Sequence, residues 1–309
     1  MDKYNKDNGA SYEPLPPSAF KLADAEGNEL SASEGIRVPA GDFSAKIMVK
    51  VGQLNSKDFP DSKKYAIPLS ITGASNYSLI PSQRSAILLL NRSILSSVAK
   101  VSGGEGIRIK PVGMHTKAEW TIQMSAIYSS LTRSNLTTAY LSNGTGGAFY
   151  TRISSTAGIQ VKNGRDGDDT WTQIPLQAGK WLHITYVHKD KKTTVYVNGK
   201  VQKVFENSAI TFGENSMIVV GNSGYRNDYL REIRLWDKAL TESEINDYLY
   251  LPMDPATPHL ISYLPLSKEM ETKDLKAPAG TENVTTKARI EYVENVKFPA
   301  DELVIVNQE

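Results

Sequence analysis

Cysteine is absent from the 309 residues, which excludes disulfide bonds, thiolate metal sites and cysteine-based catalysis. Charge of one sign is also lacking, because 35 basic and 34 acidic side chains leave a formal net charge of +1. Phosphate binding needs a basic excess on one surface, so this balance argues against nucleic acid as a partner. No apolar run approaches the ~20 residues that span a bilayer. Residues 1–7 contain no apolar signal segment, so we expect no leader in this chain.

Strand patterns dominate the sequence. Residues 181–188 form a run of β-branched and aromatic residues without Gly or Pro. A charged turn follows, and a second run, 193–197, ends at Asn198-Gly199, a pair typical of tight turns. This pattern predicts an antiparallel hairpin. Because the first run is apolar on both faces, we expect it to be central in its sheet.

The spacing of further strands predicts an all-β protein with two domains. We predict a small immunoglobulin-like β-sandwich over residues 1–95, a Ser- and Gly-rich linker over 96–105 and a larger sandwich over 106–309. Residues 43–51 alternate between apolar and polar, which predicts a half-buried strand with Phe43, Ala45, Ile47, Val49 and Val51 on its buried face.

A single convincing helix is expected near the end of the larger domain. Thr241 and Glu244 have the spacing of a capping box, in which the two side chains satisfy exposed helix N–H groups. His183 and His188 lie on opposite faces of one predicted strand, so they do not share a metal ion. For His183 we expect a structural, hydrogen-bonded role.

The first domain contains the phrases IRVPAGDFSAKIMVKV and KKYAIPLSITGASNYSLIPSQRSAILLLN. Through them, residues 12–92 resemble the DUF1735-type N-terminal domain of surface lipoproteins from Bacteroidetes. The resemblance implies an outer-membrane location at the cell surface, with membrane attachment only through a lipid anchor on a removed leader. It also implies protein partners within a glycan-utilisation system.

Three phrases of the second domain occur in family order. The first is the pattern W-T-I-x-x-x-x-I, which begins at Trp120. The second is GKWLHITYV followed by TTVYVNGK, and the third is IVVGNSGYRNDYLREIRLWDKALTESEI. Residues 106–309 thereby resemble the laminin-G/pentraxin-like branch of the concanavalin A-like lectin/glucanase superfamily. The resemblance implies a jelly-roll sandwich whose faces or rim loops often bind glycans. It also implies that Trp120, Trp181 and Trp236 fill the core.

Hydrolases on this fold, in the endoglucanase-like branch, carry the pattern Glu-x-Asp-x-x-Glu on one strand, which places paired carboxylates on one face. Neither Glu232, followed by IRLWD, nor Glu291, followed by YVEN, fits it. The sequence also lacks Gly-x-Ser-x-Gly. We therefore predict a protein without catalytic residues.

Trp171 has no core position in the family and lies in the loop phrase NGRDGDDTWTQ. Sugar recognition uses an aromatic ring that stacks on the apolar face of a pyranose, with polar groups that bond the hydroxyls. The predicted ligand-binding residues are Trp171, Tyr225, Arg226, Asn227, Asp228, Tyr140, Asn143 and Tyr150. The alternative is that these aromatics close the ends of the sandwich.

The same loop contains three acidic residues, Asp166, Asp168 and Asp169. Laminin-G-like domains can bind Ca²⁺ through such oxygens, although calcium prefers about six to eight oxygen ligands. A solvated hairpin turn is the alternative interpretation, and we expect no other cofactor.

The sequence thus predicts a non-catalytic, cell-surface carbohydrate-binding protein that captures an oligosaccharide or polysaccharide for uptake or degradation. Two alternatives remain open at this point. One is an accessory role in glycoside hydrolysis, and the other is a structural or adhesion protein that binds a protein partner through an apolar patch.

Overall fold

The computed structural model describes residues 1–31, 35–104, 106–112, 117–131, 137–140, 149–162, 168–206, 210–212, 216–221 and 225–307. The chain divides into two compact units, Met1–Arg92 and Ser93–Glu309. Regular structure is almost entirely strand, which confirms the predicted all-β class.

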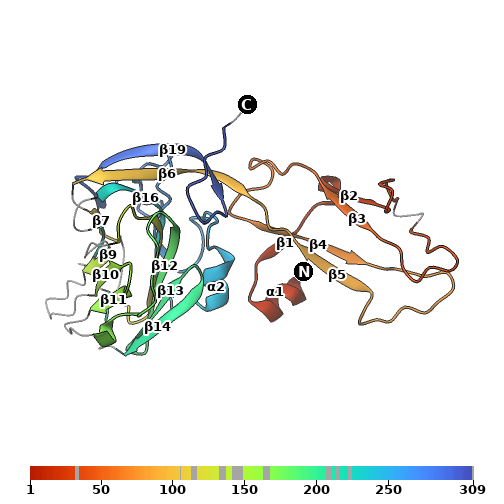
Figure 1. The fold of residues 1–309 in the computed structure, drawn as a ribbon, viewed down its shortest axis with the longest axis horizontal. Coiled ribbons are helices and arrows are strands. Elements are labelled where there is room, and N and C mark those ends of the chain that lie inside the picture. The colour runs from red at the N-terminus through yellow and green to blue at the C-terminus, as the bar shows by residue number, and fades with distance from the viewer. Residues whose placement is uncertain are drawn as a thin grey trace. The chain divides into compact units, whose positions relative to one another are not determined.

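The first unit contains two small sheets (Figure 1). Its buried apolar core is small and centres on Leu15, Tyr65 and Ile67. The three-stranded sheet has the order β1 (Tyr12–Pro14), β4 (Lys64–Ser70), β5 (Ser85–Leu89), and the two-stranded sheet joins β2 (Phe20–Ala23) to β3 (Met48–Val51). Two short helices, α1 (Asp2–Asn8) and η1 (Pro17–Ala19), precede β2.

The half-buried strand predicted over residues 43–51 is wrong for its first half. Only Met48–Val51 forms a strand, because β2 provides just four partner residues. Phe43 is fully exposed, and Ile47 and Val51 are also exposed. The alternating pattern was present, but residues 43–47 have no partner strand in the described part of the chain against which to bury it.

The second unit contains two larger sheets (Figure 1). The six-stranded sheet has the order β11 (Gly158–Lys162), β10 (Tyr150–Ser154), β9 (Thr137–Tyr140), β15 (Met217–Val220), β7 (Ile107–Ile109), β18 (Val284–Thr285). The eight-stranded sheet has the order β14 (Lys200–Glu206), β13 (Lys192–Val197), β12 (Trp181–Lys189), β8 (Trp120–Ile127), β16 (Tyr225–Trp236), β6 (Ile94–Gly103), β19 (Arg289–Phe298), with β17 (Leu260–Leu264) paired to β16.

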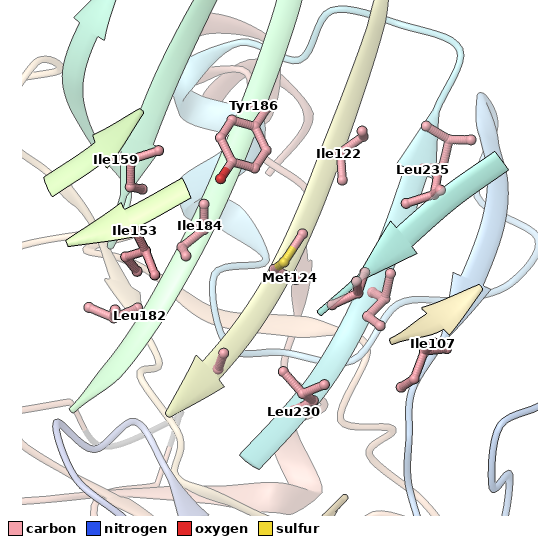
Figure 2. Packing of buried hydrophobic residues seen from close by; sticks show 14 of the residues in the cluster. Ile107, Ile122, Met124, Ile153, Ile159, Leu182, Ile184, Tyr186, Leu230 and Leu235 are labelled. Carbon is pink, nitrogen blue, oxygen red and sulfur yellow. The ribbon is translucent and has the colours of Figure 1, made fainter. Parts of the chain in front are cut away.

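Apolar side chains from both sheets form one buried cluster, which is the core of this unit. Figure 2 shows Ile184 and Tyr186 on β12 beside Ile122 and Met124 on β8, with Ile159 of the six-stranded sheet nearby. Burying a side chain of this size contributes about 1.5–3 kcal/mol. The two sheets are therefore held together by their inward-facing residues.

The predicted hairpin is confirmed, and β12 is central because it pairs with β13 on one side and β8 on the other. Asp190 and Lys191 turn the chain with φ of 50° and 61°. Asn198 and Gly199 make the next turn with φ of 51° and 74°. Positive φ at both central residues gives a turn whose twist matches that of the flanking strands.

The Ser- and Gly-rich stretch predicted as a linker is instead part of a strand. Residues 94–103 form β6, which lies between β16 and β19. Val98, Ala99 and Val101 are fully buried in it. Small side chains suit this position because both faces of the strand are covered, so they indicated close packing and not flexibility.

Further segments of the same unit cover the outer side of the eight-stranded sheet. The predicted capping box is present at Thr241–Glu244 and begins α2 (Glu242–Asp247). Ile245 of this helix packs in a cluster with Val187 and Trp236 from the sheet. A second cluster joins Trp181 to Phe298. Because these segments cover the outer side of the eight-stranded sheet, an accessible face is expected on the outer side of the six-stranded sheet.

Charged side chains are also buried on this covered side. Glu232 Oε2 accepts hydrogen bonds from Arg234 Nη2 at 2.5 Å and from Tyr263 Oη at 3.0 Å. Its Oε1 accepts from Arg231 Nη2 at 3.4 Å. The two arginines also donate to the backbone carbonyls of Tyr248, Tyr250 and Leu251. This group ties residues 248–251 to the sheet.

The two histidines of β12 have structural roles, as predicted for His183. His183 Nδ1 lies 2.6 Å from Ser125 Oγ, and His188 Nδ1 lies 2.9 Å from Thr193 Oγ1. Burial lowers the pKa of His188 to about 4. For His183, burial and then the charges of Arg231 and Arg234 lower the pKa to about 3.

Stability should therefore fall as the pH drops from 6.5 to 5. In this range an unfolded histidine, with its ordinary pKa near 6.5, takes up a proton that the folded protein does not bind. The slope is at most about 1.4 kcal/mol per pH unit for each histidine. Urea unfolding followed by tryptophan fluorescence would measure it. His183→Gln should make the slope shallower, and an identical slope in wild type and variant would contradict the assignment.

Candidate functional site

The outer side of the six-stranded sheet is defined by alternation along β10. Thr151 and Ile153 are buried, with Ile153 in the core cluster between the sheets. Tyr150 and Arg152 alternate with them, so they lie on the outer side. Both are half-buried.

The neighbouring strand β11 continues this side toward the edge of the sheet. Ile159 and Val161 belong to the core, which places Gln160 and Lys162 on the outer side. Gln160 pairs with Arg152 across the two strands. Trp171 forms an isolated antiparallel bridge with Gln160, and directly opposed residues share a face of the sheet.

Five residues therefore lie on one outer surface, which we call the Trp171 face: Tyr150, Arg152, Gln160, Lys162 and Trp171. Arg152, Gln160 and Trp171 stand in one row across the sheet, so the positions of Arg152 and Trp171 are two strand spacings, or about 10 Å, apart. Tyr150 lies two residues from Arg152 along β10. Arg152 stands beside Tyr150, with its guanidinium carbon 5.3 Å from the ring centre and its Nε 3.3 Å from the hydroxyl. The face thus has an aromatic ring near each end and polar groups between them.

Gln160 is the least exposed member of the face, with 3% of its surface accessible. Its Nε2 donates to Thr170 Oγ1 at 2.8 Å. Its Oε1 is buried and has no hydrogen-bond partner among the described residues. A buried acceptor without a donor is costly, so each such atom calls for an explanation.

Trp171 differs from the other tryptophans. Trp120, Trp181 and Trp236 are 0%, 2% and 5% exposed, which confirms their predicted core positions. Trp171 is half-buried and lies at the edge of the sheet. An indole with an accessible ring on a polar face is suited to stacking.

The phrase Tyr225–Asp228 lies elsewhere, on β16 of the eight-stranded sheet. The side chains of Tyr225 and Arg226 fall outside the described residues. Asn227 is exposed and has a φ of 62° at a bulge. Asp228 is 2% exposed, and its Oδ1 accepts from Ser129 N at 2.8 Å and Ser129 Oγ at 2.9 Å. Asp228 therefore anchors the backbone at residue 129 and is not placed to bind a ligand.

The remaining predicted residues are only partly described. Tyr140 pairs with Met217 through its backbone, while its side chain and all of Asn143 lie outside the described residues. For the predicted calcium loop, Asp166 and the side chain of Asp168 also lie outside them. Asp169 is exposed. Within the described ranges, no three His, Cys, Asp or Glu residues group as metal ligands.

The sequence predicted Trp171 and Tyr150 as ligand-binding residues, but not Arg152, Gln160 and Lys162, which lie on the same face. The signal was present, because residues 150–154 and 158–162 each alternate between core and outward positions. Pairing the two strands in register would have placed all three polar residues beside Tyr150.

Family comparisons agree with the two units. Residues 102–246 match the Laminin_G_3 model, described as the concanavalin A-like lectin/glucanases superfamily. Residues 1–78 match a second model, described as an N-terminal domain. No curated protein matches the chain. Among the described residues, no helix is long and apolar enough to cross a membrane.

Comparison with solved structures found several that are similar to the chain to different degrees. A candidate carbohydrate-binding protein from Bacteroides ovatus is 19% identical, with 97% of this chain and 85% of that chain covered and a TM-score of 0.57. A heptameric SAP-like pentraxin from Limulus polyphemus is 14% identical, with 65% and 94% covered and a TM-score of 0.42. Domain 4 of a GH43 arabinanase from Geobacillus stearothermophilus, solved with arabinotriose, is 14% identical, with 59% and 86% covered and a TM-score of 0.36.

Proposed function

We propose that the chain is a non-catalytic protein that binds an oligosaccharide or polysaccharide on the Trp171 face. The observation that carries the proposal is the half-buried Trp171 on the same side of one sheet as Tyr150, with an amide and a guanidinium between them. Pyranose rings stack their apolar C–H face on such aromatic rings, and their hydroxyls bond to amide and guanidinium groups.

The hydrogen-bonding groups fit this role. Gln160 Oε1 needs a donor, and a sugar hydroxyl between Trp171 and Arg152 would supply one once the Gln160 side chain turns outward from its buried position. The guanidinium of Arg152 offers donors for ring or hydroxyl oxygens. The Bacteroides ovatus protein with the same fold is described as a candidate carbohydrate-binding protein, which supports the proposal by analogy.

A glycoside hydrolase is the competing function, and the chemistry of the face disfavours it. Glycosidases need two carboxyl groups about 5–10 Å apart on either side of the scissile bond. None of the five residues of the Trp171 face carries a carboxylate. Glu232, on the other sheet, is buried between two arginines and a tyrosine.

Affinity gel electrophoresis would test the proposal directly. The panel would contain arabinan, xylan, galactomannan, pectin, chondroitin sulfate and mucin, with sugar release from each measured in parallel. Retardation without sugar release is the expected result, and EDTA in a duplicate gel tests the calcium alternative. Sugar release would establish the hydrolase instead, and no retardation by any polysaccharide would contradict saccharide binding.

Location at the cell surface is a second proposal, which is supported by the resemblance of residues 12–92 to domains of surface lipoproteins. Protease treatment of intact cells should degrade the protein if it is exposed there. Protection equal to that of a cytoplasmic marker would contradict it.

Gln160→Leu should weaken binding while changing the free energy of unfolding by less than about 1 kcal/mol. The substitution removes an acceptor that has no described donor, which favours the folded protein. It also removes the hydrogen bond that Gln160 Nε2 donates to Thr170 Oγ1, which opposes this gain. Binding of a polysaccharide that retards the wild type should weaken by about tenfold, the equivalent of one hydrogen bond of about 1.4 kcal/mol. Parallel loss of stability and binding would show that Gln160 is only a structural residue.

A further inference from the structure

Lys203 occupies an unusual position for a charged residue. It lies on β14, the edge strand of the eight-stranded sheet, directly opposite Val195 of β13. Val195 is fully buried in the core, and Phe205, two residues beyond Lys203, belongs to the same core. Residues directly opposite each other on paired strands share a face of the sheet, and so do residues two apart on one strand. Lys203 therefore points inward, between the two sheets at their open edge.

The contacts of Lys203 explain this position. Its Nζ donates to the backbone carbonyl of Trp171 at 2.6 Å and to that of Asp169 at 2.8 Å. The ammonium also lies 5.0 Å from the centre of the Phe205 ring, within reach of a cation–π attraction. One side chain therefore connects the edge of the eight-stranded sheet to the segment that carries Trp171.

The other described hydrogen bonds of this segment join it to the six-stranded sheet. Trp171 bridges Gln160, and Thr172 exchanges two hydrogen bonds with Ile159, from its backbone N at 2.8 Å and to its Oγ1 at 3.0 Å. These bonds fix the segment from one side. Lys203 supplies the second side, and it binds the carbonyl of Trp171 itself, so its position bears directly on the placement of the indole.

We propose that Lys203 is a positioning residue that holds Trp171 in place for saccharide binding. The proposal rests on the function proposed above. A stacking ring must be held within a fraction of an ångström by its supporting residues. The alternative role is protection of the sheet edge, because inward-pointing charges on edge strands discourage pairing with other chains.

Acrylamide quenching of tryptophan fluorescence tests the proposal without any saccharide. Three of the four tryptophans are buried, so the accessible signal comes mainly from Trp171, and Trp171→Phe defines the background. Lys203→Met keeps most of the side-chain volume but removes the donor. It should raise the quenching constant, and Lys203→Arg should restore it. Lys200→Met, at an exposed position of the same strand, is the matched control and should change nothing.

The binding readout uses whichever polysaccharide of the panel retards the wild type. Lys203→Met should bind it about tenfold more weakly, since a bond to a charged donor contributes about 1.5 kcal/mol or more. Unchanged quenching would overturn the proposal, and unchanged quenching with self-association on size exclusion would establish edge protection. Raised quenching with no binding by the wild type would contradict the saccharide function and leave the positioning of Trp171 standing. If Lys203→Met does not fold, Lys203→Leu, which also lacks a donor, provides the same comparison.

Discussion

Replacing Trp171 with alanine should reduce polysaccharide affinity by about 10- to 100-fold, or more than ~1.4 kcal/mol, because truncated aromatic anchors carry most of the binding energy at such sites. The half-buried indole packs at the sheet edge and not in the core, so the urea midpoint should move little. Trp171→Phe keeps a ring for stacking and should retain part of the affinity.

Affinity electrophoresis followed by isothermal titration with the retarding polysaccharide would measure this loss. Ile174→Ala is the matched control, since Ile174 is an exposed apolar residue three positions along the same segment. Its affinity should equal that of the wild type. Equal affinity of Trp171→Ala and wild type would place the binding site away from the Trp171 face.

Glu232→Gln should destabilise the second unit by about 3–5 kcal/mol, the usual cost of removing one partner from a buried ion pair. Both Arg231 and Arg234 are almost fully buried and would be left without a counter-charge. Glu232 also has a φ of 55° at a bulge in the middle of β16, a conformation that its contacts hold in place. The hydrogen bonds that Arg231 and Arg234 donate to the backbone of residues 248–251 should weaken as well.

The measurement is urea unfolding followed by tryptophan fluorescence. All four tryptophans lie in the second unit, so the signal reports that unit alone. Glu294→Gln breaks the exposed pair with Lys268, at 2.7 Å, and should change stability by less than about 1 kcal/mol. If Glu232→Gln lowered the free energy of unfolding no more than this control does, Glu232 would not be needed to stabilise the buried charges of Arg231 and Arg234.

Local patterns in the sequence predicted the features that local chemistry determines. The hairpin of residues 181–197, its two turns and the capping box at Thr241 depend on residues that are neighbours along the chain. These features were confirmed because each needs only its own residues.

Features that depend on distant partners were missed. The Ser- and Gly-rich β6 became a strand because β16 and β19 pair with it on both sides. Phe43 and Ile47 stayed exposed because no described strand covers them. The burial of Arg231, Glu232 and Arg234 was not predicted either, because it depends on residues 248–251, which accept hydrogen bonds from the two arginines.

Within the candidate site, the sequence predicted the aromatic residues of the Trp171 face but not the polar residues beside them. Trp171 stood out because it had no core position, whereas Gln160 and Lys203 are common residues whose importance depends on strand register. Asp228 shows the opposite error, since a loop-like phrase proved to contain a buried structural carboxylate.

The position of β6 also limits how the chain can be divided or recombined. Only Ser93 separates the last residue of the first unit from the first residue of this strand. A fragment that began at residue 106, or a fusion joined there, would lack a strand paired on both sides, and the edges of β16 and β19 would be open to other chains. The transferable module therefore begins at Ser93, and exchange of the first unit between homologues would have to keep residues 93–103 with the second.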